Sequence, residues 1–246
     1  PKAIIAVNLY GMPFKVKEIK KISEKYNIPI IEDSAESLGS SYQNDKCGTL
    51  GHFSILSFNG NKIITTSGGG ALVCKSKEIK DKAIYLSTQA KESGPEFSHK
   101  TIGYNYRMSN IVAGIGRGQM TILDSHVAKR RSNYQLYVDS FSHIDKIAFL
   151  PEPKGSFSNR WLSCILLDSY ETREGLRLAL EKENIESRPL WKPMHQQPVF
   201  KDSPSYTNGI SDELVERGLC LPSGSNLSDL ELDRVISAIN TYFASC

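Results

Sequence analysis

The chain has 246 residues and a composition typical of a globular protein, with 39% hydrophobic residues, 23% charged residues and a formal net charge of +3. This balance excludes general disorder, and basic residues scattered among acidic ones favour neither a nucleic acid nor an anionic membrane as a partner. No apolar run reaches the roughly 20 residues that cross a bilayer, and the five cysteines lack the spacing of a disulfide framework or zinc site, so we expect a cytoplasmic protein without a metal.

The first predicted elements are a strand, a helix and a second strand. Residues 3–9 (AIIAVNL) form a short apolar run, residues 16–26 carry apolar side chains at helical spacing, and residues 28–34 (IPIIEDS) form another apolar run. A connection of this length predicts that the two strands are parallel. Parallel sheets bind ligands beyond the carboxyl ends of their strands, and Asp33 lies at such an end.

The later elements continue an alternation of strands and helices, followed by a Pro-rich loop that ends near residue 204. The pattern of predicted strands and helices changes at residues 142–150. This change predicts one domain of residues 1–145 and a second of residues 146–246. We predict strands at 52–58 and 70–76, an apolar segment at 161–168, and helices at 77–88, in two segments over 109–141, at 171–183 and at 228–243.

Residues 57–73 (SFNGNKIITTSGGGALV) place Lys62 between two predicted strands, shortly before the run Gly68–Gly70. A lysine is usually exposed and unpaired. At the mouth of a parallel sheet, beside glycines that let the backbone approach a ligand, it could instead lose its proton and form a Schiff base with a carbonyl compound. Pyridoxal phosphate is the common carbonyl cofactor for this chemistry, and the glycines would allow a tight return into the next strand.

Pyridoxal phosphate also requires a partner for its pyridine nitrogen, and an aspartate can fill that role. Asp33 is suitably placed at a strand end. The alternative for this stretch is a helix N-cap at Asp33 or Ser34, with Glu36 in the first turn.

Three motifs, in this order, resemble the DegT-type sugar aminotransferases, which have the aspartate aminotransferase fold (fold type I of pyridoxal phosphate enzymes). They are IEDSAESLGSSY (31–42), LGHFSILSFNGNKIITTSGGGALVCKS (50–76) and GYNYRMSNIVAGIGRGQM (103–120). RPLWKPMHQQPVF and GLCLPSGSNLSDLEL resemble the branch that aminates 4-keto sugars carried on uridine diphosphate (UDP), including the bacillosamine-pathway enzymes. The resemblance covers the whole chain and implies an α/β fold, with a mostly parallel sheet flanked by helices in the large domain and a smaller α+β C-terminal domain.

The resemblance implies how the cofactor would be held. Lys62 would carry the Schiff base and transfer the proton to and from the bound amine, and Asp33 would pair with the pyridine nitrogen. Ser57 would bind the phosphate, and Glu36 would lie near the phenolic oxygen. Asn105 would reach the phosphate bound in the neighbouring subunit, which implies a homodimer.

The resemblance also implies the substrates, L-glutamate as amino donor and a UDP-linked keto sugar as acceptor. Arg188 and His195, in the smaller domain, would contact the nucleotide-sugar, because the guanidinium fork suits a diphosphate. An ordinary surface arginine is the alternative at position 188. Related dehydratases carry histidine where Lys62 stands, so this lysine argues against dehydration.

One departure from the family pattern supports a further alternative. Family members begin with a segment that supplies early strands and a phosphate-binding loop at a helix N-terminus, and the sequence does not contain it. We therefore expect a truncated large domain, and a non-catalytic fragment is the alternative to an active aminotransferase.

A glycine-rich segment and four isolated histidines are expected to have structural rather than ligand-binding roles. GIGRGQ (114–119) lacks the spacing of a dinucleotide fingerprint, so we predict that it lies in a helix whose glycines permit close packing. His52, His99, His126 and His143 have no second histidine at ligand spacing and are expected to be structural or solvent-facing.

Overall fold

The computed structural model describes residues 1–245, and the chain divides into two compact units. Unit 1 consists of residues 1–126 with 154–159, and unit 2 of residues 127–153 with the chain from residue 160 onward. The domain limits expected from the sequence, 1–145 and 146–246, stay a prediction.

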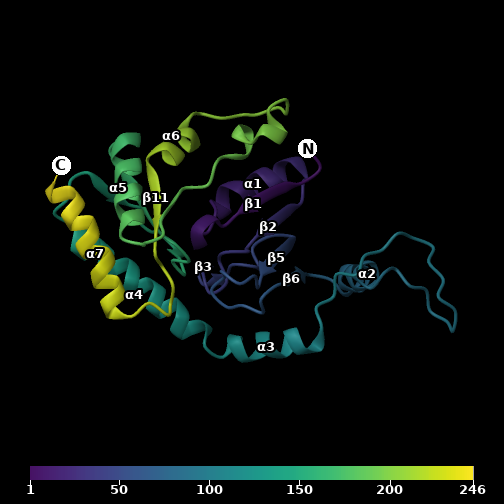
Figure 1. Ribbon diagram of the computed structural model, residues 1–246. Helices are drawn as coiled ribbons and strands as arrows, with labels where there is room; N and C mark the ends of the chain where they lie inside the picture. The colour runs from purple at the N-terminus through teal and green to yellow at the C-terminus, as the bar shows by residue number, and fades with distance from the viewer. Residues whose placement is uncertain (246) are drawn as a thin grey trace. The chain divides into compact units, whose positions relative to one another are not determined.

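The main sheet of unit 1 has four strands in the order β1-β2-β5-β6 (Figure 1). Strands β1 (Ile4–Val7), β2 (Ile30–Asp33) and β5 (Phe53–Ser57) run parallel, whereas β6 (Gly70–Cys74) is antiparallel to β5. The predicted parallel pair is therefore confirmed, and so is the mostly parallel character of the sheet. Three parallel strands also bring the carboxyl ends of β2 and β5 to one edge.

A second, smaller sheet of unit 1 has the order β4-β3-β8. Its strands are β3 (Ser41–Tyr42), β4 (Asp45–Lys46) and β8 (Ser156–Phe157), and β8 brings residues 154–159 back to unit 1. The sequence did not predict these strands, because two residues are too few to show an alternating pattern.

Serine side chains begin the helices α2 (Lys77–Ser87) and α3 (Asn110–Met120): Ser76 accepts from the Ile79 N–H and Ser109 from the Val112 N–H. These caps satisfy amides that have no partner within the helix. Helix α1 (Val16–Tyr26) ends where Asn27 adopts a left-handed conformation. The unit also has a short 3-10 helix, Leu9–Gly11, and α4 (Leu123–Phe141) crosses the boundary between the units.

Unit 2 is built on an antiparallel sheet of order β10-β11-β9-β7. Its strands are β7 (Ile147–Phe149), β9 (Ser163–Leu167), β10 (Arg188–Pro189) and β11 (Gly218–Leu221). Its helices are α5 (Tyr170–Lys182), α6 (Ile210–Arg217) and α7 (Asp229–Ala244), and short 3-10 helices span Met194–Gln196 and Pro198–Phe200.

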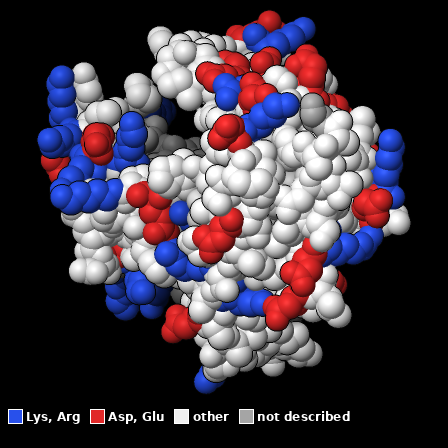
Figure 2. Space-filling model, turned by 90° about the vertical axis from the view of Figure 1, so that its left-hand side faces the viewer, with Lys and Arg blue, Asp and Glu red and all other residues white. Residues whose placement is uncertain are grey.

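The core of unit 2 lies between this sheet and the helices α4, α5 and α7. Ile165 and Leu167 on β9, Leu219 on β11, and Leu176 and Leu180 on α5 are all buried in it. Alternation along β9 therefore leaves one of its faces in the core and the other outside it. On the outer face of the molecule that Figure 2 shows, Lys and Arg lie among Asp and Glu side chains.

The sequence predictions match most of the longer elements. Residues 16–26 form the predicted helix, and the two segments over 109–141 are α3 and α4. The apolar segment at 161–168 contains β9, whereas α6 and the strands β7, β10 and β11 were not predicted. None of the helices within residues 1–245 combines the length and the apolar character that crossing a bilayer requires.

Candidate active site

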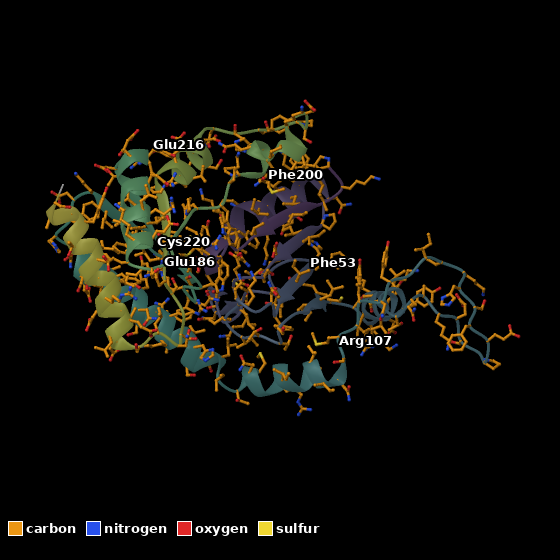
Figure 3. All side chains as sticks on the ribbon, in the orientation of Figure 1. Phe53, Arg107, Glu186, Phe200, Glu216 and Cys220 are labelled. Carbon is orange, nitrogen blue, oxygen red and sulfur yellow. The ribbon has the colours of Figure 1, made fainter. Side chains whose placement is uncertain are left out.

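The candidate site is built at the carboxyl edge of the parallel strands in unit 1. Asp33 is the last residue of β2 and Ser57 the last of β5, and the two strands are neighbours with Asp33 opposite Ile55. Lys62 follows in the connection between β5, whose first residue Phe53 is labelled in Figure 3, and β6. The topology therefore brings these three predicted residues to one edge of one sheet.

Lys62 and Glu36 form an ion pair at this edge. The Lys62 Nζ lies 3.6 Å from Glu36 Oε1, and the two side chains are only 12% and 7% exposed. The other carboxylate oxygen of Glu36 accepts a hydrogen bond of 2.6 Å from the Tyr10 N–H. Lys62 is thus largely removed from solvent, unlike an ordinary surface lysine.

The pKa of Glu36 is raised above its ordinary value, mainly because burial disfavours the charged carboxylate. The Tyr10 N–H and the Lys62 ammonium act in the opposite direction, and the charge of Asp33 raises the pKa further. Glu36 is therefore electrostatically coupled to both Lys62 and Asp33, so the structure joins three of the predicted residues in one cluster.

The alternative that residues 33–36 begin a helix is wrong. Residues 34–40 form turns, and Asp33 Oδ1 accepts a hydrogen bond of 3.1 Å from the Ala35 N–H. Ser34 instead donates its hydroxyl to Glu32. Asp33 and Glu36 therefore lie at the sheet edge and do not cap a helix N-terminus.

The glycine run shapes the return from Lys62 into β6. Gly69 has a φ of +94°, which a side chain would strain. A Cβ on Gly70 would lie 2.4 Å from the carbonyl oxygen of Leu56, because Gly70 pairs with Ser57 in the ladder. These two positions confirm that the run permits a tight backbone return.

Two side chains from the following helical segment hold the turn that carries Lys62. The His126 Nδ1 lies 2.9 Å from the carbonyl oxygen of Ile63, to which it donates, and Gln119 Oε1 accepts a 3.3 Å hydrogen bond from the Thr65 N–H. Sequence reasoning gave His126 only a general structural role. Since these partners are more than fifty residues apart, no local pattern could have paired them.

The glycines of residues 114–119 lie inside α3, as predicted. A Cβ on Gly116 would approach the Thr66 side chain to 2.9 Å, whereas Gly114 and Gly118 have open space around them. The expectation of close packing therefore holds for Gly116 alone among these three glycines.

A buried carboxylate next to the site was missed by sequence reasoning. Glu32 is fully buried and accepts hydrogen bonds from six groups. The donors to Oε1 are the Asn8 amide, the Ser34 hydroxyl and the Gly48 N–H, and those to Oε2 are the Leu50 and Gly51 N–H groups and the Ser54 hydroxyl. Glu32 thereby fixes the strand end that presents Asp33.

Asn105 lies elsewhere in unit 1. Its backbone pairs with Thr88, and the residue is exposed and lines a cavity of about 510 Å³ with Gln89 and residues 99–103. The structure does not bring Asn105 together with Lys62 in this cavity. Its predicted role across subunits stays a prediction.

Arg188 and His195 belong to unit 2. Arg188 is exposed, and its guanidinium pairs with Glu186 at 2.5 Å. His195 Nε2 lies 2.7 Å from Asp212 Oδ1, a partner that the sequence did not reveal. Arg188 also lines a cavity of about 850 Å³ together with Trp191 and Lys192.

The residues at the sheet edge fit the requirements of pyridoxal phosphate. The cofactor needs an amine for its aldehyde, an anion for its ring nitrogen and hydrogen-bond donors for its phosphate. Lys62, Asp33 and Ser57 can supply these groups, and the Lys62 amine is largely buried in its ion pair with Glu36.

Comparison with known proteins identifies the family of the chain. The profile of the DegT/DnrJ/EryC1/StrS aminotransferase family matches residues 1–240. EpsN of Bacillus subtilis (strain 168), named as a pyridoxal phosphate-dependent aminotransferase, is 47% identical over 99% of this chain and 64% of its own length. GDP-perosamine synthase of Escherichia coli O157:H7 is 34% identical over 99% of this chain and 66% of its own length.

Solved structures show the same fold. The aminotransferase TlmJ from Streptoalloteichus hindustanus has a TM-score of 0.93 and 25% identity, over 99% of this chain and 66% of its own. The chain thus spans slightly less than two thirds of the length of these proteins. With a family profile matched over nearly all of its residues, the chain belongs to the DegT/DnrJ/EryC1/StrS aminotransferase family.

Proposed function

We propose that this protein is a pyridoxal phosphate-dependent aminotransferase that transfers an amino group from L-glutamate to a nucleotide-linked 4-keto sugar. The observation that carries the proposal is the largely buried Lys62 ammonium, 3.6 Å from Glu36, at the sheet edge where Asp33 ends β2. Family membership supports the reaction class, and the names of the relatives support a sugar substrate.

The proposed cofactor site uses four residues of unit 1. Lys62 would be the covalent attachment point, Asp33 the partner of the pyridine nitrogen, Ser57 a ligand of the phosphate and Glu36 a neighbour of the phenolic oxygen. When bound, pyridoxal phosphate acts as an electron sink for the carbon that gains or loses the amino group.

Glu36 has a second use in this proposal, as a proton acceptor for Lys62. A lysine reacts as a nucleophile only after its ammonium has lost a proton. Glu36 Oε1 lies 3.6 Å from the Lys62 Nζ, and burial raises the pKa of Glu36, so its carboxylate is more basic than an exposed one. It is therefore well placed to receive the proton when Lys62 attacks.

The proposed acceptor substrate is a UDP-linked keto sugar of the kind used in bacillosamine synthesis. The support is the resemblance of residues 188–200 and 218–232 to that branch of the family. Arg188 would bind the diphosphate and His195, oriented by Asp212, would contact the sugar. GDP-linked sugars are the alternative that the similarity to GDP-perosamine synthase supports.

We also propose that the active unit is a homodimer in which Asn105 completes the neighbouring subunit's phosphate site. Apolar side chains near Asn105 in the chain are strongly exposed, as a surface that another chain covers would be. They include Phe97, Ile102, Tyr104, Tyr106 and Ile111.

The attachment of the cofactor is tested by adding pyridoxal phosphate, recording the absorbance spectrum, reducing with borohydride and mapping the modified lysine. The wild-type chain should show a visible band and an adduct on Lys62. Lys62→Ala should lose both, while Lys21→Ala, on the exposed part of α1, should keep both. An adduct spread over surface lysines in the wild-type chain would overturn the assignment.

The substrate is tested by offering UDP-linked and GDP-linked 4-keto sugars with glutamate and identifying the products by mass. Transfer of nitrogen to the UDP-sugar alone would support the full proposal. Preference for the GDP-sugar would change the proposed nucleotide carrier from UDP to GDP. Loss of water without nitrogen transfer would refute the aminotransferase assignment in favour of a dehydratase.

The dimer is tested by mixing two variants. Asn105→Ala alone should weaken cofactor binding about tenfold, as expected for one hydrogen bond to a charged group. Mixed with Lys62→Ala chains, it should regain wild-type affinity, because one site of the mixed dimer then contains both native residues. No recovery on mixing would mean that Asn105 acts within its own chain or not at all.

A further inference from the structure

Two cysteines face each other across the sheet of unit 2. Cys164 on β9 is directly opposite Cys220 on β11 in the antiparallel register, and their sulfur atoms are 3.7 Å apart. Directly opposed residues of antiparallel strands project from the same face of the sheet. The two thiols are therefore neighbours because of the fold, although 55 residues separate them in the chain.

This pair lies on the face of the sheet that is turned away from the core. The flanking residues Ile165, Leu219 and Leu221 are all buried in the core cluster, and alternation places both cysteines on the opposite face. Cys164 is half-buried and Cys220 is buried. Oxidants in solution can therefore reach Cys164 first.

Arg160 gives Cys164 a favourable electrostatic environment. Burial lowers the pKa of Arg160, and negative charge on Tyr134, Glu152 and Cys164 opposes this shift. The same attraction favours a thiolate at Cys164. The thiolate is the form of cysteine that reacts with oxidants and disulfides. Cys47 shows the contrast, because burial and the charge of Glu32 raise its pKa to about 12.

Arg188 lies beside the cysteine pair, on the neighbouring strand β10. It is opposite Cys220 on the other side of β11, so Arg188, Cys220 and Cys164 lie side by side on three neighbouring strands. Figure 3 labels Cys220 and, close to it in this view, Glu186, the ion-pair partner of Arg188. The cysteine pair is thus adjacent to a residue of the proposed nucleotide-sugar site, although its chemistry does not depend on that proposal.

We propose that Cys164 and Cys220 form a redox-modification site that a hydroperoxide converts into a reversible cross-strand disulfide. The Cys164 thiolate attacks one peroxide oxygen, which breaks the O–O bond and yields a sulfenic acid; with hydrogen peroxide, the other oxygen leaves as water after taking up a proton. The Cys220 sulfur then attacks the Cys164 sulfur, and the displaced hydroxide takes the thiol proton and leaves as a second water. Two thiols are oxidised by two electrons, and one peroxide is reduced.

The required movement is small. A disulfide has a sulfur–sulfur distance of about 2.05 Å, and the two sulfur atoms start 3.7 Å apart on strands that already hold them in register. Rotation of the two side chains can supply most of the approach, so the backbone pairing of β9 with β11 is expected to remain.

The test treats the reduced chain with one equivalent of hydrogen peroxide, blocks the remaining thiols and maps the peptides without reduction. We expect a disulfide-linked peptide pair containing Cys164 and Cys220, which dithiothreitol separates again. Cys164 should react about tenfold faster than Cys47 or more, because Cys164 is half-buried whereas Cys47 is buried and burial raises its pKa to about 12. The proposal would be overturned if, after peroxide, both cysteines still reacted fully with the blocking reagent, or if they were linked to other cysteines.

Variants identify the order of the two steps. In Cys220→Ser, Cys164 should stop at the sulfenic acid and be captured by dimedone, whereas Cys74→Ser should still give the disulfide. Cys220→Ala replaces Cys220→Ser if circular dichroism shows that the serine variant is unfolded. Failure of dimedone to label Cys164 in a folded Cys220 variant would contradict the proposed attack by Cys164.

Discussion

Replacing Glu32 by glutamine tests the hydrogen-bond network beneath the candidate site. Glutamine has nearly the same shape, but one acceptor oxygen becomes an NH₂ donor. In either orientation of the amide, this donor faces three groups that now donate to the carboxylate. The substitution therefore changes hydrogen bonding with almost no change in packing.

The magnitude follows from counting the donors that cannot adapt. On each side of Glu32, a serine hydroxyl can rotate and accept a hydrogen bond instead. On the Oε2 side the Leu50 and Gly51 N–H groups would then lack an acceptor. On the Oε1 side only the Gly48 N–H would, because the Asn8 amide also donates to Ser34 and Ser37. A buried donor without an acceptor costs roughly 1–3 kcal/mol, and glutamine can adopt the orientation that leaves one such donor, so the expected loss is about 1–3 kcal/mol. Because domains are stable by only about 5–15 kcal/mol, this is a large share of the total.

Urea unfolding followed by circular dichroism measures this loss. The matched control is Glu24→Gln on the exposed part of α1, where the free energy of unfolding should change by no more than about 0.5 kcal/mol. A loss below about 1 kcal/mol in Glu32→Gln, with the control behaving as expected, would refute the view that these donors depend on the carboxylate.

The pH dependence of stability gives a second readout. Burial alone would raise the pKa of Glu32, but hydrogen bonds from Gly48, Ser34, Ser54 and Asn8 outweigh it and lower the pKa. A group with a depressed folded-state pKa stabilises the fold above its unfolded pKa of about 4.3, and this contribution is lost as pH falls through the folded-state pKa. The stability difference between the wild-type chain and Glu32→Gln should therefore be constant near neutral pH and shrink in acid.

Two further substitutions test the turn that carries Lys62. Gly70→Ala should lower the free energy of unfolding by about 1–3 kcal/mol, because its Cβ would lie 2.4 Å from the Leu56 carbonyl oxygen; Gly68→Ala, with open space around it, is the control, and equal losses would contradict the steric reason. His126→Ala should slow adduct formation at Lys62 on borohydride trapping, whereas His126→Asn, whose amide can still donate to the Ile63 carbonyl oxygen, should restore most of the rate. Equal trapping rates in both His126 variants and the wild-type chain would show that this hydrogen bond does not position the lysine.

The sequence predicts the local parts of this protein better than the contacts between distant segments. Helix α1 and the strands that end at Asp33 and Ser57 follow from hydrophobic periodicity, which acts over a few residues. The strand β3 is too short to leave a pattern, and α6 follows a Pro-rich loop that hid its start. The pairing of Lys62 with Glu36 could not be predicted either, because it depends on how the turns after β2 and β5 meet.

Strand alternation explains why two adjacent acidic residues of β2 have different environments. Successive residues of a strand point to opposite faces, and along Ile30–Asp33 burial alternates, so that Glu32 is enclosed while Asp33 is only partly buried. The Glu32 carboxylate accepts hydrogen bonds from buried donors, whereas the Asp33 carboxylate acts electrostatically on Glu36 and can contact a ligand at the sheet edge. A one-residue shift of β2 would exchange these environments and leave Asp33 among the donors of Glu32. The register of β2 against β1 and β5, fixed along its whole length, is therefore as important for the site as the identity of Asp33.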